Sequence, residues 1–246
     1  MDISVITFTL GGRSRYLQAC IDSVYIDSRQ ENFSVEHHLV LQGYSKEQLE
    51  EDLCGTWENS DNYKFIIHEW PENIGIGAGL NKIIPQCTAP LIMKMDDDCE
   101  IISKEFFGRA LELHKKFPND VFSPYPVGLI NNPGGPRGFK HTVWKSEETG
   151  AIYTRRHVTH VGGFARFTPK SMFDNFKFSS DLIAGISGNE DGQLSQYCGA
   201  AGTTMFYLEN AMIVEHNEST LGQVVRYPEY FKNRSNESNM KIEVIE

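Results

Sequence analysis

The sequence has few cysteines, and their spacing follows no disulfide or metal-binding pattern. Five are present, far apart and with no Cys-x-x-Cys pair among them: Cys20, Cys54, Cys87, Cys99 and Cys198. An odd, scattered set argues against a disulfide framework and against a structural zinc site. It fits a reducing compartment, where thiols stay free.

A long apolar run is also missing. After Met1-Asp2 the chain goes directly into a strand-like segment, without the charged and apolar regions of a signal peptide. No apolar stretch approaches the roughly 20 residues needed to cross a bilayer. We therefore expect a cytoplasmic protein with no transmembrane segment.

The sequence has fewer basic than acidic residues. The chain has 23 Lys and Arg residues against 33 Asp and Glu residues, which gives a formal net charge of -10. Nucleic-acid binding requires a basic surface, so we expect no nucleic-acid partner. An acidic protein that handles a nucleotide needs a metal ion or a few local basic side chains.

Strand and helix patterns alternate through the first half of the chain. Short apolar runs predict strands at residues 3–8, 35–41, 64–68, 91–95 and 121–125. The segments between them have helical spacing, and Ser14 is in position to cap the first helix. Such repeats predict an α/β fold with parallel strands joined by right-handed crossovers.

The pattern is less regular after residue 126. Residues 131–138 are rich in Asn, Gly and Pro and predict a loop of the kind that acts as a lid. Two short strands are expected within residues 140–156 and another at residues 161–167. A helix is expected to open at Gly188-Asn189-Glu190-Asp191. We interpret residues 1–234 as a single domain and residues 235–246 as a polar C-terminal tail.

Three consecutive carboxylates, Asp96-Asp97-Asp98, follow the apolar run at residues 91–95. Buried carboxylates are costly unless a cation or hydrogen-bond donors meet them. The end of a strand in an open α/β sheet is where ligands usually bind, and carboxylate oxygens suit Mg²⁺ or Mn²⁺. One interpretation is therefore a divalent metal held for a phosphate-bearing substrate. The other is a solvated acidic turn, which is the commoner situation for such a triplet alone.

The order of several motifs resembles that of a known family. The motifs are Ile3-Ser4-Val5-Ile6-Thr7, Tyr16-Leu17, the glycine-rich residues 72–81, the acidic triplet, Glu190-Asp191 and Val214-Glu215-His216. In this order and spacing the chain resembles glycosyltransferases of the GT-A fold, in the broad family 2 group. The resemblance implies a Rossmann-like, mostly parallel central sheet flanked by helices. It also implies a nucleotide-sugar-binding half over residues 1–125 and a mixed acceptor-side half over residues 126–234.

The resemblance implies a metal site built on the triplet. Asp98, with Asp96 and His216, would hold Mn²⁺ or Mg²⁺ and stabilise the charge that develops on a diphosphate leaving group. Asp96 is also expected to reach the ribose. A lone histidine after a strand is otherwise a hydrogen-bonded residue near the surface, and that alternative stays open for His216.

The acceptor hydroxyl must lose its proton, and a positioned carboxylate can take it, contributing on the order of 10²–10⁴ in rate. Asp191 is our candidate base, and Glu190 is the candidate for orienting the acceptor or the base. Acidic residues are favoured at a helix N-terminus by the dipole alone, which also lowers their pKa. A structural role therefore stays open for both.

Further residues are expected to contact the nucleotide sugar. They are Thr7, Thr9, Arg13, Gln42, Gly75, Asn81, Asp96 and Asp97. Gln42 stands where family members often have an acidic residue that reads the base. Its amide can both donate and accept hydrogen bonds, so the identity of the base stays open.

We expect a metal-dependent, hexosyltransferase-type enzyme. It would move a sugar from a nucleotide-diphosphate sugar to a hydroxyl of a glycan or other acceptor, with inversion implied by the resemblance. A sugar-phosphate nucleotidyltransferase is one alternative, because residues 10–15 faintly resemble its phosphate loop. A non-catalytic module that binds nucleotide sugars or glycans is another.

Overall fold

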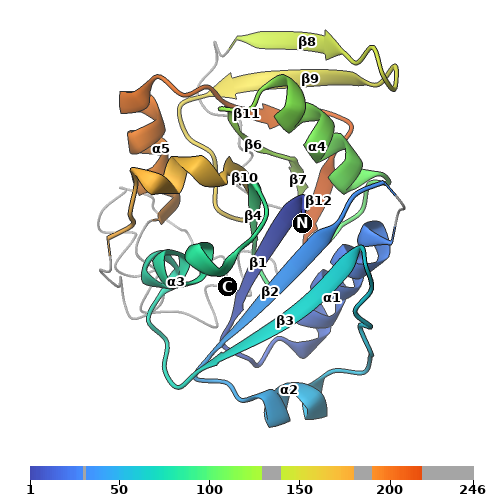
Figure 1. The fold of residues 1–246 in the computed structure, drawn as a ribbon, viewed down its shortest axis with the longest axis vertical. Helices are drawn as coiled ribbons and strands as arrows, with labels where there is room; N and C mark the ends of the chain where they lie inside the picture. Colours follow the sequence, from blue (N-terminus) through green and yellow to red (C-terminus); the bar gives the residue numbers. More distant parts are fainter. Residues whose placement is uncertain (30–31, 129–139, 180–189, 218–246) are drawn as a thin grey trace, which may run out of the picture.

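The main sheet begins with four parallel strands. The computed structural model of the protein describes residues 1–29, 32–128, 140–179 and 190–217. β1 (Ile3–Thr9) lies between β2 (Val35–Gln42) and β4 (Leu91–Met95), and β3 (Tyr63–Trp70) pairs with β2 (Figure 1). All residues of β1, β2 and β4 are buried, as is usual for parallel strands covered on both faces. The segments that follow β1 and β4 therefore lie next to each other, at the carboxyl ends of the parallel strands.

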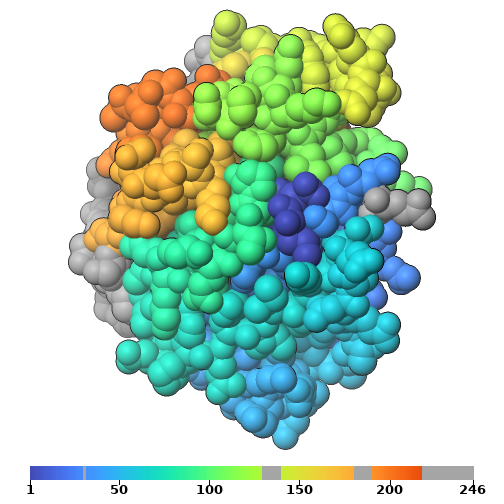
Figure 2. Space-filling model, viewed as in Figure 1, coloured from blue at the N-terminus to red at the C-terminus, as the bar shows by residue number. Residues whose placement is uncertain are grey.

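The second half of the chain extends this sheet with mixed strand directions. β10 (Ala165–Pro169) runs antiparallel to β4, with Ala165 opposite Met95. Beyond it lie β6 (Val121–Ser123), β11 (Met205–Leu208), β9 (Ile152–Val158) and β8 (His141–Lys145), in that order. The β8–β9 hairpin lies at one end of the molecule, and α2 (Lys46–Asp52) lies at the other (Figures 1 and 2).

A small second sheet brings the last described strand to the acidic triplet. β12 (Ile213–His216) lies between β5 (Cys99–Ile101) and β7 (Tyr125–Val127). It runs antiparallel to β5 and places His216 opposite Cys99. Because Cys99 directly follows the triplet, this register sets His216 beside Asp98.

Amphipathic helices cover the sheet. α1 (Ser14–Ser28) buries Leu17, Cys20, Ile21 and Val24, which follow helical spacing. The other helices are α3 (Ile76–Ile83), α4 (Phe106–Lys116) and α5 (Glu190–Ala201), with 3₁₀ turns η1 (Ile84–Gln86) and η2 (Lys170–Asp174). Within the described ranges, none of the helices has the length and apolarity needed to span a membrane.

The predicted α/β architecture is confirmed, whereas some local expectations are wrong. The run at residues 121–125 is split by Pro124 into β6 and β7, which belong to different sheets. Ser14 is the first residue of α1 rather than its cap, and Arg13 precedes it without a side-chain capping bond. Residues 131–138, Gly188 and the predicted tail lie outside the described residues.

The core of the second half is built on stacked phenylalanines, which generates a first prediction. Phe122 on β6 stacks on Phe167 of β10 and Phe206 of β11, with ring centroids 4.9 and 5.5 Å apart. Phe122→Ala should lower the free energy of unfolding by about 3–5 kcal/mol, because it removes a fully buried ring and leaves a cavity. Urea unfolding measures the change.

Ile26 provides the control, because its side chain is 70% exposed on α1. Ile26→Ala should change the free energy of unfolding by no more than about 0.5 kcal/mol. Equal effects for the two variants would contradict the packing role of Phe122.

Candidate active site

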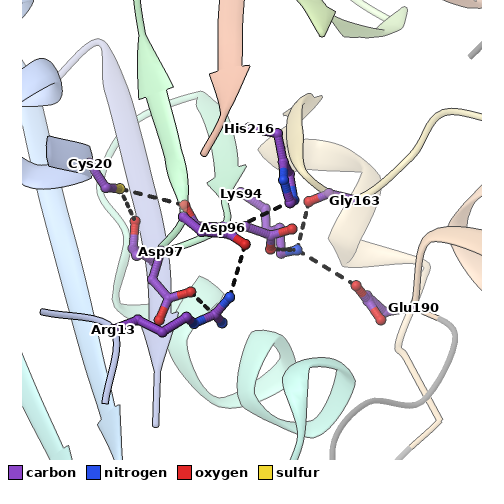
Figure 3. A network of polar contacts seen from close by, with 10 residues as sticks. Arg13, Cys20, Lys94, Asp96, Asp97, Gly163, Glu190 and His216 are labelled. Carbon is purple, nitrogen blue, oxygen red and sulfur yellow. Dashed lines mark hydrogen bonds and ion pairs between the residues drawn. The ribbon is translucent and has the colours of Figure 1, made fainter. Parts of the chain in front are cut away.

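Arg13 joins the buried carboxylates of the triplet. Its guanidinium lies beyond β1, and Nη2 is 2.7 Å from Asp97 Oδ1 while Nη1 is 2.9 Å from Asp98 Oδ2 (Figure 3). Burial raises the pKa of Asp97 to about 6, although the charge of Arg13 opposes that change. The triplet is therefore not a solvated acidic turn, because two of its three side chains are buried against a cation.

His216 meets the other oxygen of Asp98. Nε2 of His216 lies 3.5 Å from Asp98 Oδ1, the oxygen that does not contact Arg13. Ligand atoms of Asp98, Cys99 and His216 all lie within 4.8 Å of one another. Burial raises the pKa of the Cys99 thiol well above its usual value, and Mg²⁺ and Mn²⁺ prefer oxygen ligands to sulfur. A carboxylate oxygen and an imidazole nitrogen facing each other fit a divalent cation such as Mn²⁺.

A buried lysine links the triplet to the start of α5. Lys94 on β4 contacts Asp96 Oδ1, lies 2.6 Å from the carbonyl oxygen of Gly163 and is 3.7 Å from Glu190 Oε1 (Figure 3). Burial disfavours its charge, but the carboxylates of Asp96 and Glu190 outweigh that effect and raise the pKa of Lys94.

Gly163 leaves room for this contact. A Cβ at Gly163 would lie 3.0 Å from Glu190 Oε1 and 3.3 Å from Lys94 Nζ. A larger side chain would therefore have to displace one of these charged groups.

Asp191 is the second acidic residue of α5. Its Oδ2 lies 3.5 Å from Nε2 of His160, and its Oδ1 accepts a 2.8 Å hydrogen bond from the Gly192 N–H. Burial raises the pKa of Asp191, but His160, Arg166 and the Gly192 N–H outweigh it and hold that pKa below its usual range. Asp191 is therefore an anion at neutral pH.

The remaining predicted residues make hydrogen bonds within the fold. Thr7 contacts His37 Nε2 at 3.1 Å on the α1 side of the sheet, and Gln42 Oε1 accepts the Ile74 N–H at 3.0 Å. Asn81 uses both ends of its amide on the backbone of Phe178.

Thr9 and Gly75 shape the turns after β1 and before α3. The Thr9 hydroxyl accepts the Gly11 N–H at 3.1 Å, and Gly75 has a φ of 79° that favours glycine. Binding of the nucleotide sugar by Thr7, Thr9, Gln42, Gly75 and Asn81 stays a prediction.

Sequence reasoning missed Lys94, His160 and Arg166. Lys94 had a detectable signal, since a single lysine inside the apolar run at residues 91–95 must find a buried partner. Arg166 is opposite Lys94 in the β4–β10 pairing, a relation that only the sheet register reveals. His160 comes from the segment between β9 and β10, and no spacing pattern connects it to Asp191.

The sequence profile described as glycosyl transferase family 2 matches residues 4–176, which is more than half of the chain. The chain belongs to this family. Its described fold, with a large mixed sheet flanked by helices, is the GT-A fold of the similar solved structures. No curated protein matches the sequence significantly.

Solved structures of glycosyltransferases are similar to this family 2 chain. GalNAc-T7 with UDP, GalNAc and Mn²⁺ has a TM-score of 0.66 and 14% identity, over 90% of this chain and 44% of that one. S. aureus TarS 1–349 in complex with UDP-GlcNAc has a TM-score of 0.62 and 14% identity, over 91% of this chain and 61% of that one. A longer TarS chain is matched over only 37% of its length. At such identities the likeness is one of fold.

The linkage through Lys94 generates a second prediction. Lys94→Met should lower the free energy of unfolding by about 3–5 kcal/mol, because it leaves the carboxylates of Asp96 and Glu190 without their buried cation. Chemical denaturation measures the loss.

The matched control is Lys115→Met. Lys115 pairs with Glu148 at 3.1 Å, and the two side chains are 78% and 70% exposed. An exposed pair contributes at most about 1 kcal/mol. A small effect at Lys94, comparable with that at Lys115, would rule out the proposed electrostatic link.

Proposed function

We propose that this family 2 chain is a metal-dependent, hexosyltransferase-type glycosyltransferase. It moves the sugar of a nucleotide-diphosphate sugar to a hydroxyl of a glycan or other acceptor, with inversion at the anomeric carbon. The solved structures with UDP, UDP-GlcNAc or Mn²⁺ support the class of donor and of metal ion.

One observation carries this proposal. Lys94 contacts the carboxylate of Asp96 and lies 3.7 Å from that of Glu190, so a single side chain joins the end of β4 to the start of α5. Glycosyl transfer needs a region that binds the leaving group and a base beside the acceptor, a few ångströms apart. The arrangement around Lys94 provides carboxylates on both sides.

The donor side is built from Asp96, Asp98, His216 and Arg13. Asp98 and His216, with Asp96, would hold Mn²⁺ or Mg²⁺, which supplies charge neutralisation for the departing diphosphate. Arg13 contacts both Asp97 and Asp98, and its charge opposes the rise that burial causes in the pKa of Asp97. It also adds positive charge where the phosphates would lie.

The acceptor side is built from Asp191 and Glu190. As the acceptor oxygen attacks the anomeric carbon, its O–H bond breaks and Asp191 takes the proton, while the bond from that carbon to the phosphate oxygen breaks. The low pKa of Asp191 makes it a weak base, which suits a proton that is transferred after the attack has begun. Glu190, held by Lys94, orients the acceptor hydroxyl.

The alternatives receive less support. The family match argues against a sugar-phosphate nucleotidyltransferase. A binding module without turnover has no need of an anionic carboxylate at Asp191, next to the charged pair of Lys94 and Glu190. The two following experiments separate catalysis from binding.

A third prediction concerns the base. Asp191→Asn should lower the turnover number by about 10²–10⁴-fold, because the amide cannot accept the proton, while nucleotide binding stays unchanged. Sugar transfer is measured on donor and acceptor panels with Mn²⁺, and binding is measured by thermal shift.

Asp174→Asn is the control, because Asp174 is exposed on η2. It should leave both measurements unchanged. Full turnover in Asp191→Asn would remove Asp191 from its proposed role, and absence of transfer by the native chain across the panels would argue for the binding module.

A fourth prediction concerns the metal and the nucleotide. UDP, GDP, dTDP and CMP are tested by thermal shift, each with and without Mn²⁺. One nucleoside diphosphate should raise the melting temperature only when Mn²⁺ is present, because a ligand that binds the folded state stabilises it by about 2.7 kcal/mol at 100 times its Kd.

Asp98→Asn should abolish this shift, and Asp61→Asn, at an exposed position, should retain it. A shift that persists in Asp98→Asn would disprove the assignment of Asp98. No shift with any nucleotide would overturn the proposed donor site.

A further inference from the structure

A second group of metal-ligating side chains lies at the opposite end of the main sheet. Glu36 and His38 are two residues apart on β2 and therefore point to the same face. Cys87 follows η1, shortly before β4 begins. One ligand atom from each lies within 4.8 Å of the others, and the three side chains are 2%, 1% and 2% exposed. Glu36 pairs with Ser4 near the start of β1, whereas the acidic triplet follows the end of β4.

The His38 ring has one nitrogen paired and one aimed into this group. Nδ1 lies 2.9 Å from Nε2 of His68 on the neighbouring strand β3, and the two rings stack. Nε2 has no hydrogen-bond partner among the described residues and lies 3.5 Å from Glu36 Oε1. If the shared proton is on Nδ1, the lone pair of Nε2 faces a carboxylate oxygen. In this tautomer a cation between the two acceptors would stabilise them, whereas in the opposite tautomer Nε2–H would point at Glu36.

Glu36 is held as a buried anion. Its carboxylate accepts hydrogen bonds from the Ser4 hydroxyl at 2.5 Å and from the Thr88 N–H and hydroxyl at 2.5 and 2.9 Å. Burial raises the pKa of Glu36, but contacts with His38, Ser4 and Thr88 outweigh it and hold the pKa well below its usual range. Within the described ranges Glu36 forms no ion pair with Lys or Arg, so its charge lacks a strong counterion.

We propose that Glu36, His38 and Cys87 form a structural site for a divalent cation of the Zn²⁺ class. A carboxylate oxygen, an imidazole nitrogen and a thiolate sulfur form a ligand set that zinc accepts and that Mg²⁺ does not. His68 would accept a hydrogen bond from Nδ1 of His38. Such a bond fixes the tautomer of a metal-ligating histidine.

Binding releases the thiol proton of Cys87. Burial raises the pKa of this thiol to about 12, so the cysteine is neutral until the metal displaces its proton. The cation would join β2 to the turn that leads into β4, the strand that ends at the triplet. The cysteine spacing gave no sign of zinc because the ligands come from one strand and a distant turn that the fold brings together.

Cobalt titration tests this site directly. Co²⁺ is added to the EDTA-treated full chain, and the thiolate-to-cobalt charge-transfer band in the near ultraviolet is recorded. We expect a band that saturates at one Co²⁺ per chain and that Zn²⁺ bleaches by displacement. Cys87→Ser should abolish it, and His38→Gln should weaken cobalt binding by at least tenfold.

Two other buried cysteines provide matched controls. Cys99 lies in the cluster with Asp98 and His216, and Cys198 on α5 contacts Met172 on η2. Cys99→Ser and Cys198→Ser should both retain the band. A band that follows Cys99 instead of Cys87 would assign the thiolate to the triplet and overturn the proposal, as would the absence of any band.

A measurement on the native sequence keeps the test independent of variant folding. Zn²⁺ should raise the melting temperature of the EDTA-treated chain. In the ¹⁵N spectrum of the histidine rings, Nε2 of His38 should be unprotonated and shifted by Zn²⁺. A proton on Nε2 both with and without Zn²⁺ would show that His38 donates to Glu36 and that no metal site exists.

Discussion

The buried ammonium of Lys94 is the constraint on which the rest of the site depends. A lysine inside an apolar strand is stable only if carboxylates surround it, and those carboxylates are Asp96 after β4 and Glu190 at the start of α5. The cation therefore fixes the distance between two segments that are far apart in the chain. Gly163 must be small because both charged groups approach its backbone. The geometry of the site thus follows from the electrostatics of one residue.

Arg13 supplies the positive charge beside Asp97 and Asp98, as Lys94 supplies it beside Asp96. It sits between Asp97 and Asp98, two carboxylates that would repel each other in a buried environment. Its contact with Asp98 uses Oδ2 and leaves Oδ1 facing His216. One carboxylate therefore faces a permanent cation with one oxygen and an imidazole nitrogen with the other. The triplet is consequently three residues in three different environments.

Most of the fold could be predicted from the sequence because buried parallel strands give mostly apolar runs, such as residues 3–8 and 91–95. β5 could not, since three residues paired with a distant strand leave no periodicity to detect. The acidic residues of the candidate site could be found in the sequence because they are adjacent in the chain, as in the triplet and Glu190-Asp191, and their roles stay predictions. The cations that balance these acids were harder to find. Lys94 and Arg166 are neighbours only because of the β4–β10 register. His160 lies beside Asp191 only because of the path that the chain takes after β9.

The pairing of β5 with β12 has a consequence for the biosynthesis of the protein. Asp98 leaves the ribosome early, whereas His216 belongs to the last strand of the described chain. A nascent chain therefore holds the triplet and Arg13 well before it holds the imidazole that faces Asp98. Until β12 pairs with β5, the triplet has the cations Arg13 and Lys94 as neighbours but not His216. The contact between Asp98 and His216 can therefore form only after β12 has been synthesised, long after the strand with which β12 pairs.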